Sequence, residues 1–391
     1  MDKKQIRNYT ADIIEDVRKN GDKAVLKYLK RFDGVDLSKS GYRVSQKEID
    51  AASENVSPEF KRAIKTSYAN VLAFHKRELS QIKKSWKYVK NSVITGQFYT
   101  PVSSAGLYIP GGRFPYPSTV IMTAVAAKAA GVERIVIVSP PKNITAEVLY
   151  AAKICAVKEI YKVGGIAAIA ALAYGSETIE KVNIIAGPGN MYVNEAKRQV
   201  FGDVGIDSLA GPSEVAIIAD RDVPEKYAAA DIMAQVEHDP MARAYLFCEC
   251  KTKIAKIKAL LPKEALKQVV IERCSLNKAV EKTNALAPEH LELLVKDYAK
   301  LVKDVKNAGA VFAGWQTPTA AGDYWAGPSH VLPTNASAKF ASGLSAATFL
   351  KRTSYIELNK KNKKAYKEIA ALAQAEGMAY HKKSAVERSV L

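Results

Sequence analysis

The sequence predicts an α/β protein in which two Rossmann-like, doubly wound parallel sheets pack together. Short β-branched segments alternate with helical segments from about residue 119 to residue 200, and the same alternation resumes near Ser213. Glycine-rich turns also follow the predicted strands, as expected where a parallel strand leads into a helix. A cleft between two such domains is a usual place for a ligand.

The N-terminal part, up to about residue 75, is predicted to be helical. Apolar residues recur at helical spacing between Thr10 and Phe32. Ser45, followed three residues later by Glu48, matches a capping box and predicts a helix start. From Gln97 onward the sequence is more typical of strands, and this stretch ends in a Pro-Gly-Gly turn.

The two alternating regions supply the parallel sheets, because strands that alternate with helices pair in parallel. In the first region, helices are expected at residues 119–130, 145–157, 166–175 and 192–201, and strands at residues 134–141, 159–165 and 182–190. In the second region, strands are expected at residues 214–220 and 243–250, on either side of a helix that runs through Asp231–Glu237. The final stretch, from Leu344 to Leu391, is expected to be a small helical arm or domain.

These boundaries predict three domains. The first α/β domain combines residues 1–107, which include the N-terminal helices, with residues 213–343. An inserted second Rossmann-like domain covers residues 108–212, and the C-terminal helical arm covers residues 344–391. A chain of 391 residues is long enough for this organisation, since a domain usually takes about 100–200 residues.

Composition argues against several classes of protein. The net charge of +18 is typical of nucleic-acid binding, but the lysines are scattered among acidic residues and no nucleic-acid-binding motif is present. The most apolar stretch, residues 118–141, contains Lys128, Glu133 and Arg134, so no membrane span is expected there. The four cysteines include no C-x-x-C pair and are expected to be reduced. A soluble, cytoplasmic protein is predicted, with neither nucleic acid nor membrane as a partner.

Three glycine-containing turns mark the first candidate ligand site. They lie at residues 107–112, 163–165 and 186–190, and each follows a predicted strand and precedes a predicted helix. In that context backbone N–H groups and a helix N-terminus can approach a phosphate. None of the turns matches G-x-G-x-x-G, and a glycine after a strand is often only turn chemistry. Three such turns at one sheet edge nevertheless favour a nucleotide or another anionic ligand.

Histidines mark the second candidate site. Of the five in the chain, His75 has no neighbouring residue that suggests chemistry. Gln235 and His238 are three residues apart on a predicted helix, so one metal ion could bind both side chains. Glutamine is an unusual zinc ligand, however, and from the residues alone a capped helix end before Pro240 is the better interpretation.

Glu289 and His290 follow Pro288, a residue that suits the first turn of a helix. The sequence therefore predicts that both lie at a helix N-terminus, where the helix dipole favours a carboxylate and disfavours an imidazolium. A neutral histidine in this place can act as a general base. A solvent-facing histidine beside a plain N-terminal carboxylate is an equal alternative.

Two further histidines have acidic neighbours. Asp323 and His330 occupy a Gly/Pro-rich segment that is predicted to be a loop, and functional residues are common on loops. His381 follows Glu376 near the C-terminus, where an exposed helical histidine is the simpler interpretation. A Ser-His-Asp hydrolase is disfavoured, because no G-x-S-x-G motif is present and a proline precedes Ser213.

Taken in order, several of these segments resemble the histidinol dehydrogenase family. The matching strings are LYIPGG, AALAYGSE, GPGNMYVNEAKRQV, AGPSEV, the Gln235–His238 segment, APEHLEL, AGDYWAGPSHVLPT and EGMAYHKK. The resemblance runs from about residue 10 to residue 386, and the order and spacing of the strings make it specific. It implies an NAD-dependent, zinc-dependent four-electron oxidation of L-histidinol, through L-histidinaldehyde, to L-histidine.

The resemblance also implies roles for single residues. Glu289 and His290 would be the catalytic acid–base pair. One zinc ion per subunit would be held by Gln235, His238, Asp323 and His381. The substrate would contact Ser213, Gln235, His238, His290, Asp323, His330, Glu376 and His381. NAD would contact Tyr108 and Asn190. The protein would be a homodimer in which the active site is shared, with His381 reaching in from the other subunit.

One position departs from the family pattern. The family usually has a glutamine that contacts NAD two residues after the second glycine of the 163–165 turn, and this chain has Ala167 there. The resemblance therefore implies one cofactor contact fewer. A related enzyme that oxidises another primary alcohol, such as a sulfonated propanol, is the alternative within the same class.

Overall fold

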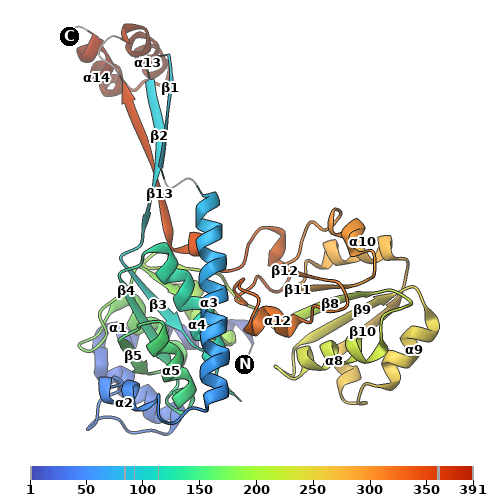
Figure 1. Cartoon of the computed structure of the whole chain (residues 1–391). Coiled ribbons are helices and arrows are strands. Elements are labelled where there is room, and N and C mark those ends of the chain that lie inside the picture. Colours follow the sequence, from blue (N-terminus) through green and yellow to red (C-terminus); the bar gives the residue numbers. More distant parts are fainter. Residues whose placement is uncertain (1, 83–84, 92, 113, 359–361, 390–391) are drawn as a thin grey trace. The chain divides into compact units, whose positions relative to one another are not determined.

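The computed structural model describes residues 2–82, 85–91, 93–112, 114–358 and 362–389. The chain forms two compact units. The larger unit contains Met1–Glu78 and Val102–Phe349, and the smaller one contains Leu79–Pro101 and Leu350–Leu391. Figure 1 labels many of the helices and strands of both units. Within the described part of the chain, no helix combines the length and apolar character needed to cross a membrane.

The first sheet of the larger unit has five parallel strands in the order β5-β4-β3-β6-β7. The strands are β3 (Ser104–Tyr108), β4 (Arg134–Ser139), β5 (Glu159–Lys162), β6 (Ile184–Ala186) and β7 (Gly205–Ile206). The first strand along the chain therefore lies at the centre, with the next two on one side and the last two on the other. This order is that of a Rossmann-type sheet, and the predicted doubly wound fold is confirmed for this region.

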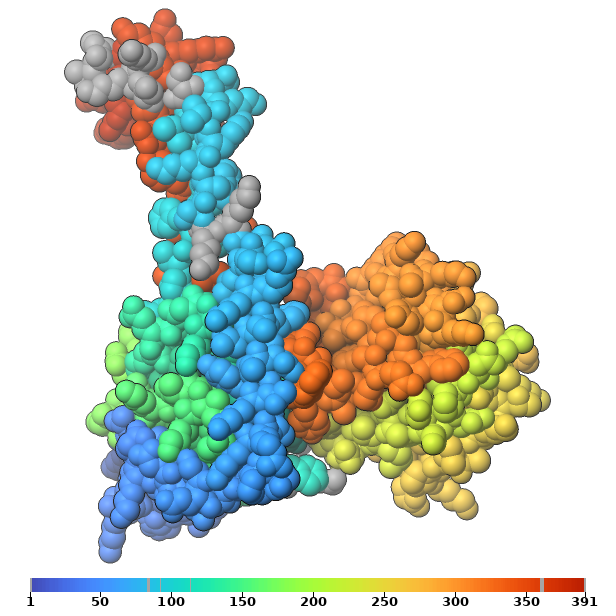
Figure 2. All heavy atoms as spheres, viewed as in Figure 1, coloured from blue at the N-terminus to red at the C-terminus, as the bar shows by residue number. Residues whose placement is uncertain are grey.

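Helices cover both faces of the first sheet (Figure 1). They are α1 (Lys3–Asp33), α2 (Gln46–Ala51), α3 (Pro58–Gln81), α4 (Pro117–Ala130), α5 (Ala146–Ile154), α6 (Gly165–Tyr174) and α7 (Met191–Val200). One apolar core contains side chains of α3, α4 and α5, and a second contains side chains of α1, α6 and α7. The predicted capping box is confirmed, because Ser45 and Glu48 exchange hydrogen bonds at the start of α2. Figure 2 shows the N-terminal segment, in blue, against the green region that contains α4 to α6.

The second sheet repeats this topology, with five parallel strands in the order β10-β9-β8-β11-β12. The strands are β8 (Glu214–Ala219), β9 (Arg243–Cys248), β10 (Val269–Arg273), β11 (His290–Leu294) and β12 (Ala310–Ala313). The accompanying helices are α8 (Glu225–Val236), α9 (Lys251–Ala259), α10 (Leu276–Leu286), α11 (Tyr298–Val302) and α12 (Thr319–Tyr324). Short 3-10 turns occur at Pro141–Asn143, Ala265–Gln268, Ser337–Lys339 and Ala346–Phe349. The second region of alternation is thus also confirmed as a parallel sheet.

The start of β11 contradicts one sequence prediction. Glu289 and His290 were expected at the N-terminus of a helix, but α10 ends at Leu286 and His290 is the first residue of a buried strand. Ala287 turns the chain with a positive φ of 52°. A short apolar run such as HLELL fits a buried parallel strand as well as a helix, and Pro288 cannot distinguish the two. The helix-dipole argument for a neutral His290 therefore does not apply.

The smaller unit contains a strand where only helix was expected. Its antiparallel sheet has the order β1-β2-β13, formed by β1 (Ser85–Lys90), β2 (Val93–Pro101) and β13 (Leu350–Leu358). Two helices follow, α13 (Lys363–Ala375) and α14 (Ala379–Ser389). Most side chains of β13 are exposed, so the segment lacks the alternation of buried and exposed residues by which a strand is recognised. The two C-terminal helices were predicted correctly.

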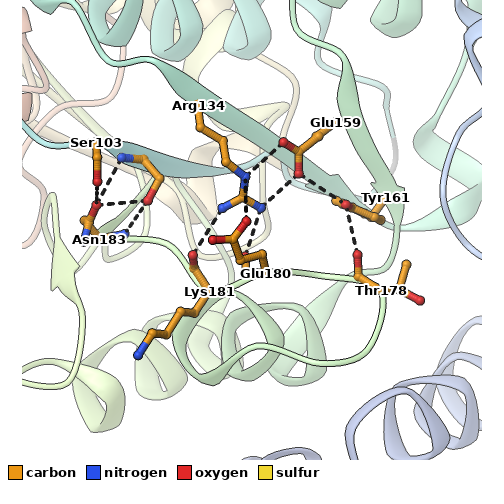
Figure 3. A network of polar contacts seen from close by, with 9 residues as sticks. Ser103, Arg134, Glu159, Tyr161, Thr178, Glu180, Lys181 and Asn183 are labelled. Atoms are coloured by element: carbon orange, nitrogen blue, oxygen red, sulfur yellow. Dashed lines mark hydrogen bonds and ion pairs between the residues drawn. The ribbon is translucent and has the colours of Figure 1, made fainter.

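A polar network fastens the amino-terminal edge of the first sheet (Figure 3). Arg134, at the start of β4, donates two hydrogen bonds of 2.9 Å each to the Glu159 carboxylate at the start of β5. Its guanidinium also donates to the backbone carbonyls of Glu180 and Lys181. The Asn183 side-chain oxygen accepts hydrogen bonds from Ser103 and Ser104. These contacts fix the loop that leads into β6, whose other end forms a glycine turn.

A buried ion pair supports that glycine turn. Lys197 of α7 and Asp207 have only 1% and 3% of their side chains exposed. The Lys197 ammonium donates to the Gly187 carbonyl at 3.0 Å, and the Asp207 carboxylate accepts from the Gly187 N–H at 2.7 Å. Gly187 has a φ of +117°, and a Cβ there would overlap the backbone carbonyl of Tyr108. The pair therefore holds the turn between β6 and α7 against the end of β3.

Lys197→Met is expected to lower the free energy of unfolding by about 3–5 kcal/mol, because it leaves the Asp207 carboxylate buried without its counter-ion. The double variant Lys197→Met/Asp207→Asn removes that charge and should recover part of the loss. Urea unfolding of the two variants and the parent measures the difference. Equal losses in the single and double variants would contradict this view of the pair.

Candidate active site

A cavity of about 370 Å³ in the larger unit collects six of the residues singled out from the sequence. They are Ser213, His238, Glu289, His290, Asp323 and His330. We call this the acid–histidine cavity. Its walls come from the glycine turns after β3 and β6 and from residues at the amino-terminal ends of β8 and β11. Residues separated by more than a hundred positions are thus brought together between the two sheets.

Glu289 is almost completely buried in the acid–histidine cavity. Its carboxylate accepts a hydrogen bond from the Ser213 hydroxyl and another, of 3.2 Å, from the Glu214 N–H. Burial raises the pKa of the Glu289 carboxyl, while the neighbouring His290 and the Ser213 hydroxyl partly offset that rise. A carboxyl group whose pKa is moved toward neutrality can both accept and release a proton under mild conditions.

His290 lies beside Glu289 with its ring largely buried. The His290 Nδ1 is 3.8 Å from the Glu289 Oε2, and among the described residues this nitrogen has no hydrogen-bond partner. The ring packs against Phe312 at a centroid distance of 5.6 Å. A histidine with a free ring nitrogen beside a carboxylate can take up a proton, because the carboxylate stabilises the imidazolium that results.

His330 and Asp323 form a second acid–imidazole contact. The His330 Nδ1 is 3.2 Å from the Asp323 backbone oxygen and 3.9 Å from its Oδ1. On the other side of the ring, Nε2 is 3.1 Å from the Thr119 hydroxyl. Burial lowers the pKa of His330, which favours the neutral ring. Asp323 was expected in a loop, but it lies in the helix α12, whose six residues are too few to give a periodic pattern.

Gln235 and His238 were expected on one helix, but α8 ends at Val236, so His238 lies in the turn beyond it. Gln235 is buried, and no described residue hydrogen-bonds its side-chain nitrogen. His238 and Asp323 line the cavity. Two imidazoles, an amide and a carboxylate are oxygen and nitrogen donors that zinc accepts. The chemistry of this donor set therefore fits a zinc ion, which Gln235 would bind through its amide oxygen, with His381 as the remaining predicted ligand.

Glu376 and His381 lie in the smaller unit, at the end of α13 and in α14 respectively. Both are exposed on that unit. Among the residues that the structure describes, no group of three or more His, Cys, Asp or Glu side chains surrounds one metal position. Of the predicted ligands, the larger unit contributes His238, Asp323 and Gln235.

A second cavity, of about 420 Å³, contains both residues that were predicted to contact NAD, Tyr108 and Asn190. We call it the aromatic cavity. Glycines from two of the three predicted turns line it, as does Ala167 of α6. The Tyr108 hydroxyl accepts a hydrogen bond of 3.1 Å from the Gly165 N–H, and burial raises the pKa of this tyrosine to about 12. The Asn190 side chain caps α7.

Sequence reasoning missed several residues of the two cavities. The far wall of the aromatic cavity consists of Tyr9, Tyr28, Phe32 and Asp33 from α1. These residues look like the ordinary pattern of an amphipathic helix, and only the packing of α1 on α6 and α7 brings them to the glycine turns. Thr119, the hydroxyl partner of His330, was likewise missed, because a threonine at a helix start carries no distinctive signal.

Comparisons with known proteins show which family the whole chain resembles. The family model described as histidinol dehydrogenase matches residues 1–389. The chain is 46% identical over 392 residues to the histidinol dehydrogenase of Thermosynechococcus vestitus, covering 95% of this chain and 90% of that one. It is 41% identical over 393 residues to the enzyme of that name from Methanococcus maripaludis, with 97% and 92% covered. The crystal structure of histidinol dehydrogenase from Elizabethkingia anophelis is 35% identical and superposes with a TM-score of 0.92, covering 98% and 92%.

Proposed function

This chain belongs to the histidinol dehydrogenase family, and we propose that its acid–histidine cavity oxidises L-histidinol through L-histidinaldehyde to L-histidine. The protein is an NAD-dependent oxidoreductase of the last steps of histidine biosynthesis. One observation supports the assignment of this cavity above others: six of the residues for which the family resemblance implies a role line it together.

The chemistry follows from the two side chains at the amino-terminal end of β11. His290 takes the proton of the substrate hydroxyl, and bound NAD would accept the hydride of the carbon that carries this hydroxyl. The Glu289 carboxylate, held by Ser213 and the Glu214 N–H, stabilises the imidazolium. After the first oxidation, Glu289 accepts a proton from the water that adds to the aldehyde. A second NAD would accept the hydride of the hydrate, and the carboxylate would result.

Zinc, one ion per subunit, would be held by Gln235, His238, Asp323 and His381. When bound, it would supply a Lewis acid that orients the amino and imidazole groups of the substrate. Ser213, His330 and Glu376 would complete the substrate contacts together with the metal ligands and His290. Because Glu376 and His381 belong to the smaller unit, we propose that the complete site forms in a homodimer in which the smaller unit of one subunit serves the larger unit of the other.

NAD would bind in the aromatic cavity, against Tyr108 and Asn190. Backbone N–H groups of the surrounding glycine turns suit its phosphates. Ala167 stands on the first turn of α6 and lines the same cavity. It offers no hydrogen bond where the family resemblance leads us to expect a glutamine.

Ala167→Gln is therefore expected to lower the KM for NAD several-fold, since one hydrogen bond contributes about 0.5–1.5 kcal/mol. The KM for L-histidinol should stay unchanged, because Ala167 is absent from the lining of the acid–histidine cavity. Initial-rate kinetics with each substrate varied in turn measure both constants. A higher KM for NAD in the variant would contradict this placement of the cofactor.

The division into an α/β domain of residues 1–107 and 213–343, an inserted domain of residues 108–212 and an arm of residues 344–391 stays a proposal, as does the cytoplasmic location. Limited proteolysis of the full-length protein, with the cleavage sites mapped, tests these boundaries.

A substrate comparison tests the proposed function. Zinc-loaded protein should reduce NAD with L-histidinol, and the value of kcat/KM for a sulfonated propanol should be lower by orders of magnitude. His330 and the metal ligands suit a substrate with an imidazole and an amino group, and a sulfonate would place an anion near Glu289 and Asp323. Faster turnover of the sulfonated alcohol would replace the proposal with the alternative substrate.

A further inference from the structure

Glu292 is a fully buried carboxyl group that the proposed reaction does not use. It lies on β11, two residues after His290, and none of its surface is exposed. Side chains two residues apart on a strand point to the same face of the sheet. Glu292 therefore lies on the same face of β11 as His290, one step further along the strand.

Two helices contact Glu292 from that face. The N–H of Thr319, at the first position of α12, donates a hydrogen bond of 2.9 Å to the Glu292 Oε1. The carboxyl of Asp231, on α8, neighbours that of Glu292 and is also buried. One buried group thus connects β11, α8 and α12.

A hydrogen bond between these two neighbouring carboxyls requires a proton. The Glu292 Oε2 accepts no hydrogen bond from any described residue, so an ionised Glu292 would leave one buried oxygen unpaired beside a second negative charge. Burial and the nearby Asp231 charge raise the pKa of Glu292 well above its ordinary value. A protonated Glu292 can donate from Oε2 to Asp231 while Oε1 accepts from Thr319, and every buried polar atom of the group is then satisfied.

The spacing of these contacts connects them to the proposed metal site. Asp231 lies four residues before Gln235 on α8, and Thr319 lies four residues before Asp323 on α12. Positions four apart on a helix share a face. Each contact of Glu292 is therefore one helical turn from a proposed zinc ligand, and Glu292 itself is two residues from the proposed base.

We propose that Glu292 is a positioning residue that sets the distance between the helix carrying Gln235 and the helix carrying Asp323, relative to the strand carrying His290. The inference rests on the proposed zinc site and goes beyond it, because Glu292 itself contacts neither metal nor substrate. Residues that orient metal ligands in this indirect way typically change metal affinity about 10- to 100-fold when they are replaced.

Glu292→Gln and Glu292→Leu distinguish the hydrogen bonds of the Glu292 side chain from the space that it fills. The glutamine can still accept from Thr319 and donate to Asp231, whereas the leucine fills similar space and does neither. Asp220→Leu provides a matched control. Asp220 is a buried carboxylate of the same sheet that binds the backbone N–H groups of Val223 and Lys296, at the opposite end of β8 from Ser213.

The measurement is the zinc dissociation constant of each full-length variant, by competition with a chromophoric chelator, together with its thermal midpoint. E292L should bind zinc about 10- to 100-fold more weakly, whereas E292Q and D220L should stay close to the parent, even though D220L loses thermal stability. If E292L binds zinc as tightly as D220L does, the inference is overturned while the proposed function stands. If the parent itself binds no zinc, both fall.

Thr319→Pro keeps the inference testable if E292L does not fold. Proline suits the first position of a helix. The substitution removes two things, the threonine side chain and the backbone N–H that donates to Glu292. Weaker zinc binding in T319P supports the inference, and unchanged binding in a folded T319P overturns it.

Discussion

His290→Ala is expected to lower kcat for L-histidinol about 100- to 10,000-fold, the range over which a positioned general base contributes. The structural reasons are the His290 Nδ1, which no described residue hydrogen-bonds, and the Glu289 carboxylate oxygen 3.8 Å away. His290 is not among the proposed zinc ligands, so zinc affinity and the KM for NAD should change little. Steady-state kinetics and metal content of the purified variant test both expectations.

Phe312→Leu serves as the control for His290→Ala. It alters the ring that packs on His290 but removes no proton acceptor, so its kcat should fall far less. Added imidazole should also restore part of the rate of the alanine variant, because the deleted ring leaves space beside Glu289. If His290→Ala kept most of the parental kcat, His290 would not be the general base.

Removal of zinc is expected to abolish the oxidation of L-histidinol, and added zinc should restore it in the parent protein. His238→Ala should remain inactive at the same zinc concentration, because one of the proposed ligands that line the acid–histidine cavity is lost. Dialysis against a chelator, followed by zinc titration of activity, measures both effects.

Glu237→Gln controls for changes in the turn after α8, because Glu237 is the exposed neighbour of His238. Added zinc should restore the activity of this variant as it does that of the parent. Full activity of the chelated protein, verified as metal-free by elemental analysis, would contradict a role for zinc. If ordinary zinc concentrations restored the activity of His238→Ala, His238 would not be a zinc ligand.

Much of the fold could be predicted from the sequence, because a parallel sheet requires strands and helices that alternate along the chain. Buried strands such as Arg134–Ser139 and Glu214–Ala219 are continuous apolar runs bounded by turns, and the helices between them have the expected length. The segments that were predicted wrongly are short or exposed to solvent. HLELL at residues 290–294 is ambiguous by length, and β13 has little buried surface to reveal its pairing with β2.

The candidate site was less accessible to sequence reasoning, because its residues are joined only by packing. The sequence identified Glu289, His290 and His330 as candidates, but not that Glu289 and Ser213 share a hydrogen bond. The site also lies at the amino-terminal ends of β8 and β11, whereas the usual expectation for a parallel sheet is its carboxyl-terminal edge. The contribution of α1 to the aromatic cavity had no sequence signal of its own.

The yield of NADH per L-histidinol is the most direct test of the proposed four-electron reaction. With limiting L-histidinol, excess NAD and zinc, we expect two NADH for each L-histidinol consumed and L-histidine as the product, and no NADH after removal of zinc. A yield of one NADH with accumulated aldehyde, or no turnover by the zinc-loaded protein, would contradict it.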